Sequence, residues 1–415
     1  MTPADLKHVI DALDRGLTFD RPADVALSGF FRDADKLGGR DRALVAEAYY
    51  GVIRHLRSLQ ALAEPVTPRR LALAWLARFG GHNLREFETL VKKDADLAWL
   101  KTVKTADLQD QSEAVRLDLP DWLYERLAGQ YGDHLPVLMA ALNRPATLDL
   151  RVNRLKTDRD TLLAALNAEG IEAQATPFAP TGIRLAGKPA LQKHPLFLDG
   201  LIEVQDEGSQ LLALLTGPRR GEMVCDFCAG AGGKTLAMGA MMRSTGRLYA
   251  FDVVEKRLNK LKPRLARSGL SNVHPILLSD ERDQHIKRLA GKFDRVLVDA
   301  PCSGLGTLRR NPDLKWRQTP ESVAEMAVKQ ATILVAASRL VKSGGRMVYA
   351  TCSLLAEENE AVVNAFLGEH GEFRLKPVNE LLREAGISLD TGEALRLDPA
   401  SHGTDGFFAA VMERV

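Results

Sequence analysis

The stretch MVCDFCAGAGGKTLAMGA, residues 223–240, joins a short apolar run to a glycine-rich turn and then to a second apolar segment. The first run has the length of a buried strand, and the segment after the glycines has the apolar spacing of a helix. Strand, glycine turn and helix in this order form the unit from which parallel sheets covered by helices are built. We therefore predict an α/β fold around this stretch.

The same alternation continues toward the C-terminus. RLYAFDVV at 247–254 leads into the basic helical segment EKRLNKLKPRLARSG at 255–269. Further apolar runs end in polar residues: HPILLSD at 274–280, DRVLVDAPC at 294–302 and RMVYATCS at 346–353. This pattern predicts a parallel, doubly wound sheet, and the ligands of such sheets bind beyond the carboxyl ends of the strands.

The residues before this sheet divide into two parts. The amino-terminal part reads as helical, since the segment 40–59 carries apolar residues at helical spacing. Later, LDLRVNRL at 148–155 alternates like a half-buried strand, and TDRDTLLAALNAEG at 157–170 reads as a capped helix. We predict an all-α domain at 1–140, a small α+β linking module at 141–215 and the α/β domain at 216–415.

Composition favours a cytoplasmic protein. Hydrophobic residues make up 45% of the 415 residues and charged residues 27%, as in ordinary globular proteins, and a net charge of +2 requires any nucleic-acid surface to be local. The charged amino terminus lacks the apolar core of a secretory signal, and no window approaches the ~18 apolar residues of a spanning helix. In the cytoplasm the four cysteines stay reduced. We expect neither a membrane partner nor a metal.

The turn at residues 228–234 is a candidate ligand-binding loop, because its glycines let the backbone approach a ligand closely. Asp252 ends the next apolar run, where a carboxylate can accept hydrogen bonds from ribose hydroxyls. A phosphate-binding P-loop is a weak alternative, because Cys228 stands where that motif needs glycine, and the dinucleotide-binding pattern is incomplete. A zinc or redox role for Cys225 and Cys228 is weak too, since no second ligand pair is nearby. Cys225 is predicted to be a buried strand residue.

Two other cysteines follow apolar runs in polar loops: Cys302 in DAPCSG and Cys352 in TCS. Carbon 5 of cytosine becomes nucleophilic once a thiolate has added to carbon 6, and a cysteine is suited to that addition. A carboxylate such as Asp299 can hydrogen-bond the edge of the base. Two cysteines at neighbouring strand ends suit the separate steps of attack and release. The alternative is a pair of buried, small apolar side chains. The chemistry alone does not say which cysteine attacks.

The segment GTLRRNPDLKW, residues 306–316, follows Cys302 directly. It combines cations with an aromatic residue, a set that suits phosphate contact and base stacking. An ordinary solvated loop is the alternative. We predict that the segment contacts RNA through Arg309, Arg310, Lys315 and Trp316.

Taken together, these motifs resemble the RNA cytosine-5 methyltransferase family, and most closely its bacterial branch that acts on small-subunit ribosomal RNA and carries a NusB-like amino-terminal domain. The similarity to the catalytic part covers residues 145–415, and the helical part, with DRALVAEAYYGVIRHL at 41–56, resembles a NusB-type bundle. The motifs that carry the resemblance are RVN at 151–153, VQDEGS at 204–209, DFCAGAGGKT at 226–235, DAPCSG at 299–304, RRNPDLKW at 309–316, TCS at 351–353 and DGFFAA at 405–410.

The resemblance implies a Rossmann-like class I methyltransferase that uses S-adenosyl-L-methionine and methylates carbon 5 of a cytidine in RNA through a covalent cysteine–cytosine intermediate. It assigns the attack to Cys352 and the release of methylated RNA to Cys302, and it places Asp280 near the adenine and Asp299 near both the methionine moiety and the target base. The implied cofactor-binding residues are Cys228, Ala229, Gly230, Ala231, Gly232, Gly233, Lys234, Asp252, Asp280 and Asp299.

One departure from the family pattern concerns the cofactor loop, in which Gly230 and Ala231 stand where the family has alanine and proline. The loop is expected to be less stiff for that reason. We expect ribosomal RNA as the substrate, with transfer RNA left open, and a cytidine in a loop or bulge, because a base in a stack must first be extruded. A monomer without an obligate protein partner is expected. A DNA cytosine-5 methyltransferase and a non-catalytic NusB-like RNA-binding factor are the alternatives.

Overall fold

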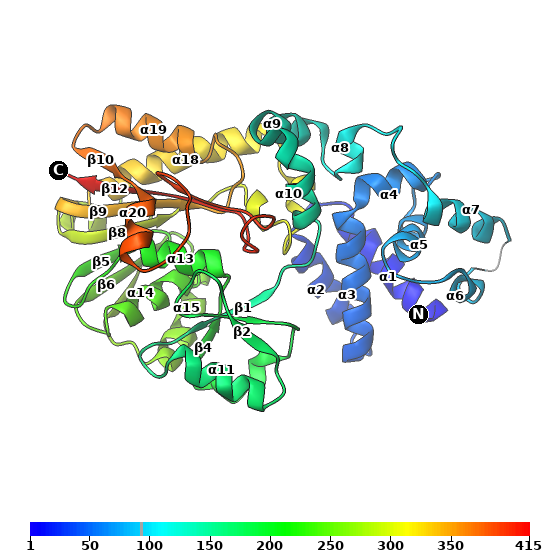
Figure 1. Ribbon diagram of the computed structural model, residues 1–415, viewed down its shortest axis with the longest axis horizontal. Coiled ribbons are helices and arrows are strands. Elements are labelled where there is room, and N and C mark those ends of the chain that lie inside the picture. Colours follow the sequence, from blue (N-terminus) through cyan, green and yellow to red (C-terminus); the bar gives the residue numbers. More distant parts are fainter. Residues whose placement is uncertain (92–93) are drawn as a thin grey trace. The chain divides into compact units, whose positions relative to one another are not determined.

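The structure, a computed structural model, describes residues 1–91 and 94–415 (Figure 1). These residues form two compact units. The first comprises Met1–Arg144 and Thr307–Pro320, and the second comprises Pro145–Gly306 and Glu321–Val415. No helix in the described part of the chain has the length and apolar character needed to cross a membrane.

The first unit is built from helices, as predicted for the amino-terminal part. Its first helix starts at a capping box in which Thr2 and Asp5 bond each other's backbone amides. The segment predicted as helical at 40–59 is interrupted at His55, between α3 and α4. The helices of this unit are α1 (Pro3–Gly16), α2 (Ala23–Asp33), α3 (Gly39–Arg54), α4 (Leu56–Leu62), α5 (Pro68–Arg78), α6 (Leu84–Glu88), α7 (Asp94–Thr105), α8 (Glu113–Arg116), α9 (Asp121–Tyr131), α10 (Leu135–Leu142) and the short α17 (Leu314–Arg317).

The second unit opens with a small antiparallel sheet of order β2-β3-β1-β4. One face of this sheet is apolar, and Leu150 and Ile183 on it pack with Leu162 and Leu166 of the helix α11. The sheet and helix correspond to the predicted α+β module, whose standing as a separate domain stays a prediction. The elements are β1 (Leu148–Val152), α11 (Arg159–Ala168), β2 (Ala173–Ala175), β3 (Gly182–Leu185), α12 (Pro195–Leu198) and β4 (Ile202–Val204).

The main sheet has the order β10-β12-β9-β8-β5-β6-β7, with β11 paired to β12. Strands β9, β8, β5, β6 and β7 are parallel, which confirms the predicted doubly wound α/β fold. The other edge is antiparallel, because β12 runs against β9, β10 and β11. The strands are β5 (Met223–Asp226), β6 (Arg247–Asp252), β7 (Val273–Leu277), β8 (Phe293–Asp299), β9 (Val341–Thr351), β10 (Phe373–Lys376), β11 (Leu395–Leu397) and β12 (Phe407–Arg414).

Alternate side chains of the central strands enter two cores. Leu297 and Val348 face the core shared with α13, α14, α15 and α20, whereas Val298 and Tyr349 face the core shared with α18 and α19 (Figure 1). This period of two is what a strand covered on both faces requires. The helices are α13 (Glu207–Thr216), α14 (Gly233–Met241), α15 (Glu255–Ser268), α16 (Gln284–Arg288), α18 (Pro320–Ser338), α19 (Glu360–Glu369) and α20 (Val378–Glu384).

Candidate active site

The candidate site residues gather at one edge of the main sheet, the edge formed by the carboxyl ends of the parallel strands. Asp252 is the last residue of β6 and Asp299 the last of β8, while Cys352 directly follows β9. The strand order reverses at β5, since the chain proceeds from β5 to β6 on one side and returns to β8 on the other. Ligands of doubly wound sheets bind at such a switch point.

The glycine turn between β5 and α14 is held in place by Asp252. Its carboxylate accepts the backbone amide of Gly230 at 2.8 Å and that of Val254 at 2.8 Å. Gly230 has a φ of +57°, a conformation that favours glycine. Gly232 has a φ of +83°, and a Cβ there would lie 2.1 Å from a methyl group of Leu261. Helix α14 begins immediately after this glycine.

An ion pair joins the turn to the end of β8: Lys234 Nζ donates to Asp299 Oδ2 at 2.6 Å. Burial acts to lower the pKa of Lys234, but the Asp299 carboxylate outweighs it and the pKa is raised. Asp226 at the end of β5 accepts a hydrogen bond from Thr235 Oγ1 at 2.6 Å. Burial raises the pKa of Asp226 to about 7, and its Oδ1 has no hydrogen-bond partner within the described residues. The carboxyl groups of Asp226, Asp252 and Asp299 therefore lie around the turn together with the amino group of Lys234.

The two cysteines that the sequence singled out are brought together. Cys302 Sγ and Cys352 Sγ lie 3.3 Å apart, and both side chains are half-buried. The hydrogen bond with Cys352, together with burial and the Glu358 carboxylate, raises the pKa of the Cys302 thiol. Either sulfur can donate this hydrogen bond to the other. A sulfur that accepts an S–H bond is the one better able to carry negative charge.

The other two cysteines are separate from this pair. Cys225 lies within β5 and is fully buried in the core, as predicted. Cys228 packs against the same core from the glycine turn. Burial raises the pKa of both thiols, so each stays protonated at neutral pH. These two thiols belong to the core, whereas Cys302 and Cys352 lie beyond the ends of β8 and β9.

Comparisons with known proteins agree with this geometry. Residues 213–413 match the family described as 16S rRNA methyltransferase RsmB/F, and residues 119–192 match the RsmF/B-like ferredoxin-like domain. A probable ribosomal RNA small subunit methyltransferase B of Synechocystis is 34% identical over 408 residues, which cover 90% of this chain and 91% of the relative. The chain belongs to the RsmB/F methyltransferase family.

Further relatives support this membership. Ribosomal RNA small subunit methyltransferase B of Sodalis glossinidius is 33% identical, with 91% of this chain and 90% of the relative covered. The crystal structure of a methyltransferase homolog protein from Pyrococcus horikoshii is 31% identical and superimposes with a TM-score of 0.63, covering 73% of this chain and 97% of the other. Both the family and the α/β methyltransferase fold expected from the motifs are confirmed.

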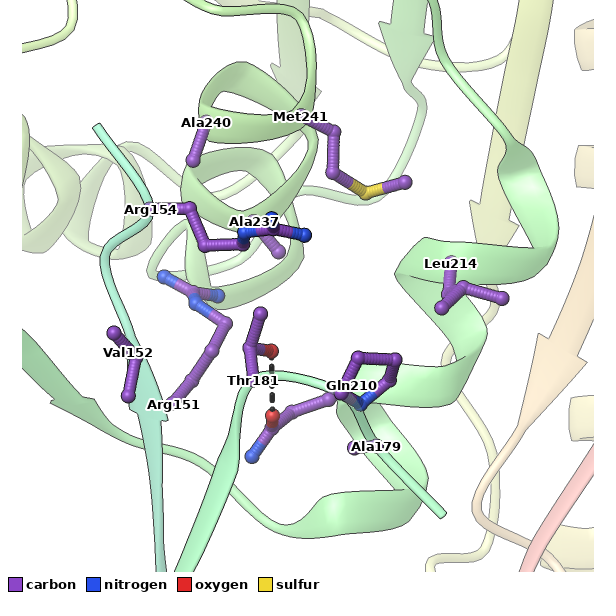
Figure 2. Close-up of a pocket in the computed structure, with 11 residues that line it drawn as sticks. Arg151, Val152, Arg154, Ala179, Thr181, Gln210, Leu214, Ala237, Ala240 and Met241 are labelled. Atoms are coloured by element: carbon purple, nitrogen blue, oxygen red, sulfur yellow. Dashed lines mark hydrogen bonds between the residues drawn. The ribbon is translucent and has the colours of Figure 1, made fainter. Parts of the chain in front are cut away.

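The RVN motif of this RsmB/F protein connects the small sheet to the glycine turn. Arg151 of β1 donates to Gly233 O at 2.5 Å and to Gln205 Oε1 at 2.6 Å. Figure 2 shows Arg151 in the wall of a pocket between β1 and α14, opposite Met241. Asn153 Nδ2 donates to Gly200 O and to Ser268 O, each at 2.9 Å. Arg151 therefore supports the glycine turn from behind, whereas Asn153 joins the small sheet to the end of α15.

The predicted RNA-contacting segment belongs to the helical unit, and the structure revises the expectation for three of its side chains. Lys315 is fully buried and donates to Arg54 O at 2.7 Å and to Asn143 Oδ1 at 3.1 Å. Trp316 Nε1 donates to Ile53 O at 2.8 Å. Arg309 is buried as well, whereas Arg310 is exposed. Lys315 and Trp316 thus anchor the segment on the helices, and contact of Arg310 with RNA stays a prediction.

Sequence reasoning missed Glu358, which lies beneath the cysteine pair. This residue is fully buried, and it accepts hydrogen bonds from the residues that follow both cysteines. The only signal was a carboxylate shortly after the TCS motif, in the run AEENE. Such a charged run is usually a solvated surface, so nothing in its composition marks one of its members as buried.

Proposed function

We propose that this chain methylates carbon 5 of a cytidine in RNA, with small-subunit ribosomal RNA as the substrate and S-adenosyl-L-methionine as the methyl donor. The single observation that carries the proposal is the 3.3 Å approach of Cys302 and Cys352 beside the ion pair of Lys234 and Asp299. Names of the relatives, which are ribosomal RNA small subunit methyltransferases, support the choice of RNA.

The residues around the glycine turn fit the cofactor. The open space around the Cα of Gly230 leaves room for a ligand against the backbone, and the Asp252 carboxylate is suited to accept from ribose hydroxyls. The unpartnered Asp226 Oδ1 is a buried acceptor that a ligand would satisfy. Asp280 stands in an exposed position beyond β7, where we assign it to the adenine. When bound, the cofactor supplies an electrophilic methyl group.

Cys352 is the nucleophile in this proposal. Its thiolate adds to carbon 6 of cytosine, which breaks the aromaticity of the ring and makes carbon 5 nucleophilic. The S–H group of Cys302 stabilises that thiolate before the attack. Asp299, held by Lys234, is oriented to hydrogen-bond the cytosine edge. After methylation the Cys302 thiolate, as the base that assists release, takes the proton from carbon 5, the double bond between carbons 5 and 6 re-forms, and Cys352 leaves as a thiolate.

The test combines methylation with trapping of the intermediate. Wild-type protein is incubated with labelled cofactor and either small-subunit ribosomal RNA, transfer RNA or duplex DNA, and 5-methylcytidine is identified in the nucleoside digest. Cys302→Ala is expected to accumulate a covalent protein–RNA adduct that survives denaturing gel electrophoresis. Cys352→Ala is expected to form none and to be inactive.

Each outcome bears on one part of the proposal. Methylation of DNA but not RNA would favour a DNA cytosine-5 methyltransferase, and an absence of methyl transfer would favour a non-catalytic RNA-binding factor. Adduct formation by Cys352→Ala together with none by Cys302→Ala would exchange the roles of the two cysteines. Methylation of transfer RNA alone would refute ribosomal RNA as the substrate.

A further inference from the structure

Glu358 lies directly beneath the cysteine pair, between the end of β9 and the start of α19. It is fully buried. Its Oε1 accepts from the backbone amide of Ser303 at 2.8 Å and from Gln330 Nε2 at 2.9 Å. Its Oε2 accepts from the hydroxyl groups of Ser303 and Ser353. Ser303 follows Cys302 and Ser353 follows Cys352, so one carboxylate holds both cysteine-bearing loops.

The chemistry of these partners requires a carboxylate. An ionised carboxyl group is purely an acceptor, and its two oxygens together offer about four lone-pair sites. The two N–H groups and two hydroxyl groups that surround Glu358 match that capacity. Glutamine at this position would turn an NH2 group toward the two serine hydroxyls. A buried charge is retained only where it is fully hydrogen-bonded, as this one is.

Neighbouring side chains extend the same support. Gln330 of α18 donates from the same Nε2 to Pro301 O at 2.9 Å. The residues before and after Cys302 are therefore both held by hydrogen bonds. Tyr349 of β9 donates its hydroxyl to Glu358 O at 2.6 Å. Asn359 Nδ2 donates to Ser353 O at 3.1 Å, which fixes the backbone of the Cys352 loop. Both cysteine-bearing loops are therefore held by hydrogen bonds to residues 358–359.

We propose that Glu358 is a positioning residue for methyl transfer, which ties the Cys302 loop to the Cys352 loop and so fixes the two sulfurs relative to each other. This inference rests on the cysteine mechanism proposed above. The carboxylate acts through the two loops and does not itself contact the substrate. Its negative charge is one of the causes that raise the pKa of Cys302.

The primary test is Glu358→Gln, which keeps the shape of the side chain and removes the charge. The matched control is Glu360→Gln, an equivalent change two residues away at a half-buried carboxylate that pairs with the exposed Arg396 at 2.7 Å. For each full-length variant, kcat and KM are measured on the RNA substrate of the wild type. Alkylation rates of Cys302 and Cys352 by iodoacetamide are measured from pH 6 to 10 by peptide mass spectrometry.

Glu358→Gln is expected to lower kcat by about 10- to 100-fold, because small misplacements of reacting groups cost that much, with KM for RNA unchanged. The alkylation profile of Cys302 is expected to move to lower pH, whereas Glu360→Gln matches the wild type in both measurements. A kcat within twofold of the wild type, or an unmoved Cys302 profile, would overturn the inference.

Two milder variants serve if Glu358→Gln does not fold. Each of the variants Ser303→Ala and Ser353→Ala removes one hydroxyl group that donates to Glu358 and leaves the other donors in place. Each is expected to lower kcat less than Glu358→Gln does. Full activity in both would refute the positioning role. Failure of the proposed function is distinguishable, because wild-type protein and Glu360→Gln would then make no 5-methylcytidine, while the alkylation shift would still report on Glu358.

Discussion

Replacing Lys315 by methionine tests whether this lysine is a buried anchor of the helical unit instead of an RNA contact. Burial lowers the pKa of Lys315 from 10.5 to about 7. Between these two values the unfolded chain holds the lysine proton and the folded chain does not, so the stability contributed by this group rises with pH. Each pH unit changes the free energy of unfolding by about 1.4 kcal/mol, and from pH 7 to 9 the gain is therefore up to about 3 kcal/mol.

Lys315→Met removes this pH dependence along with the hydrogen bonds to Arg54 O and Asn143 Oδ1, each worth about 1 kcal/mol. At pH 9 the wild type still carries about 2 kcal/mol of deprotonation cost, which offsets the two hydrogen bonds, so the variant is expected to match the wild type there and to exceed its stability at pH 7. The assay is urea unfolding followed by tryptophan fluorescence at pH 7, 8 and 9. It reports on the helical unit alone, because all four tryptophans lie there: Trp75, Trp99, Trp122 and Trp316.

The control is Lys7→Met, in which an exposed lysine that pairs with Asp11 is replaced on the same unit. Its pH dependence is expected to match that of the wild type. If Lys315→Met showed the same slope of stability against pH as the wild type, the buried, deprotonated lysine would be refuted. A large loss of RNA affinity in Lys315→Met at unchanged stability would restore the RNA contact predicted from the sequence.

Three further predictions concern the rest of the chain. Gly232→Ala places a methyl group against Leu261 at a positive φ, so thermal unfolding is expected to reveal a loss of about 2 kcal/mol and calorimetry a weaker cofactor complex. Asp252→Asn presents an amide where the Gly230 and Val254 amides donate, and cofactor affinity is expected to fall about tenfold or more by the same calorimetry. Arg310→Ala is expected to weaken RNA binding in a filter-binding assay and to flatten its salt dependence, with cofactor affinity unchanged.

The parallel half of the sheet could be predicted because its signal is local. Each buried strand is a short apolar run with a polar end, followed by a turn and a helix, and residues 223–240 show all three parts. The antiparallel edge carried no comparable signal. Strand β12 (Phe407–Arg414) is also an apolar run, but its direction depends on pairing with β9, which lies far away in the sequence. The pattern of apolar residues indicates which side chains are buried, but not the direction in which a strand runs.

The candidate site was predictable to the extent that strand ends define it. Asp252, Asp299, Cys302 and Cys352 follow apolar runs, and parallel pairing alone brings their positions to one edge. Lys315 could not be assigned in this way. Its burial depends on acceptors at Arg54 and Asn143, which come from distant helices, and a cationic loop has the same composition whether it is buried or solvated.

The two cysteines are equivalent in sequence terms, since each ends an apolar run and precedes a serine. Their surroundings distinguish them. Cys302 sits in a loop whose next residue binds the Glu358 carboxylate through both its amide and its hydroxyl, whereas Ser353 after Cys352 offers only its hydroxyl. The hydrogen bond with Cys352, burial and the Glu358 carboxylate raise the pKa of the Cys302 thiol. One carboxylate therefore holds the two loops differently, although the cysteines look alike in the sequence.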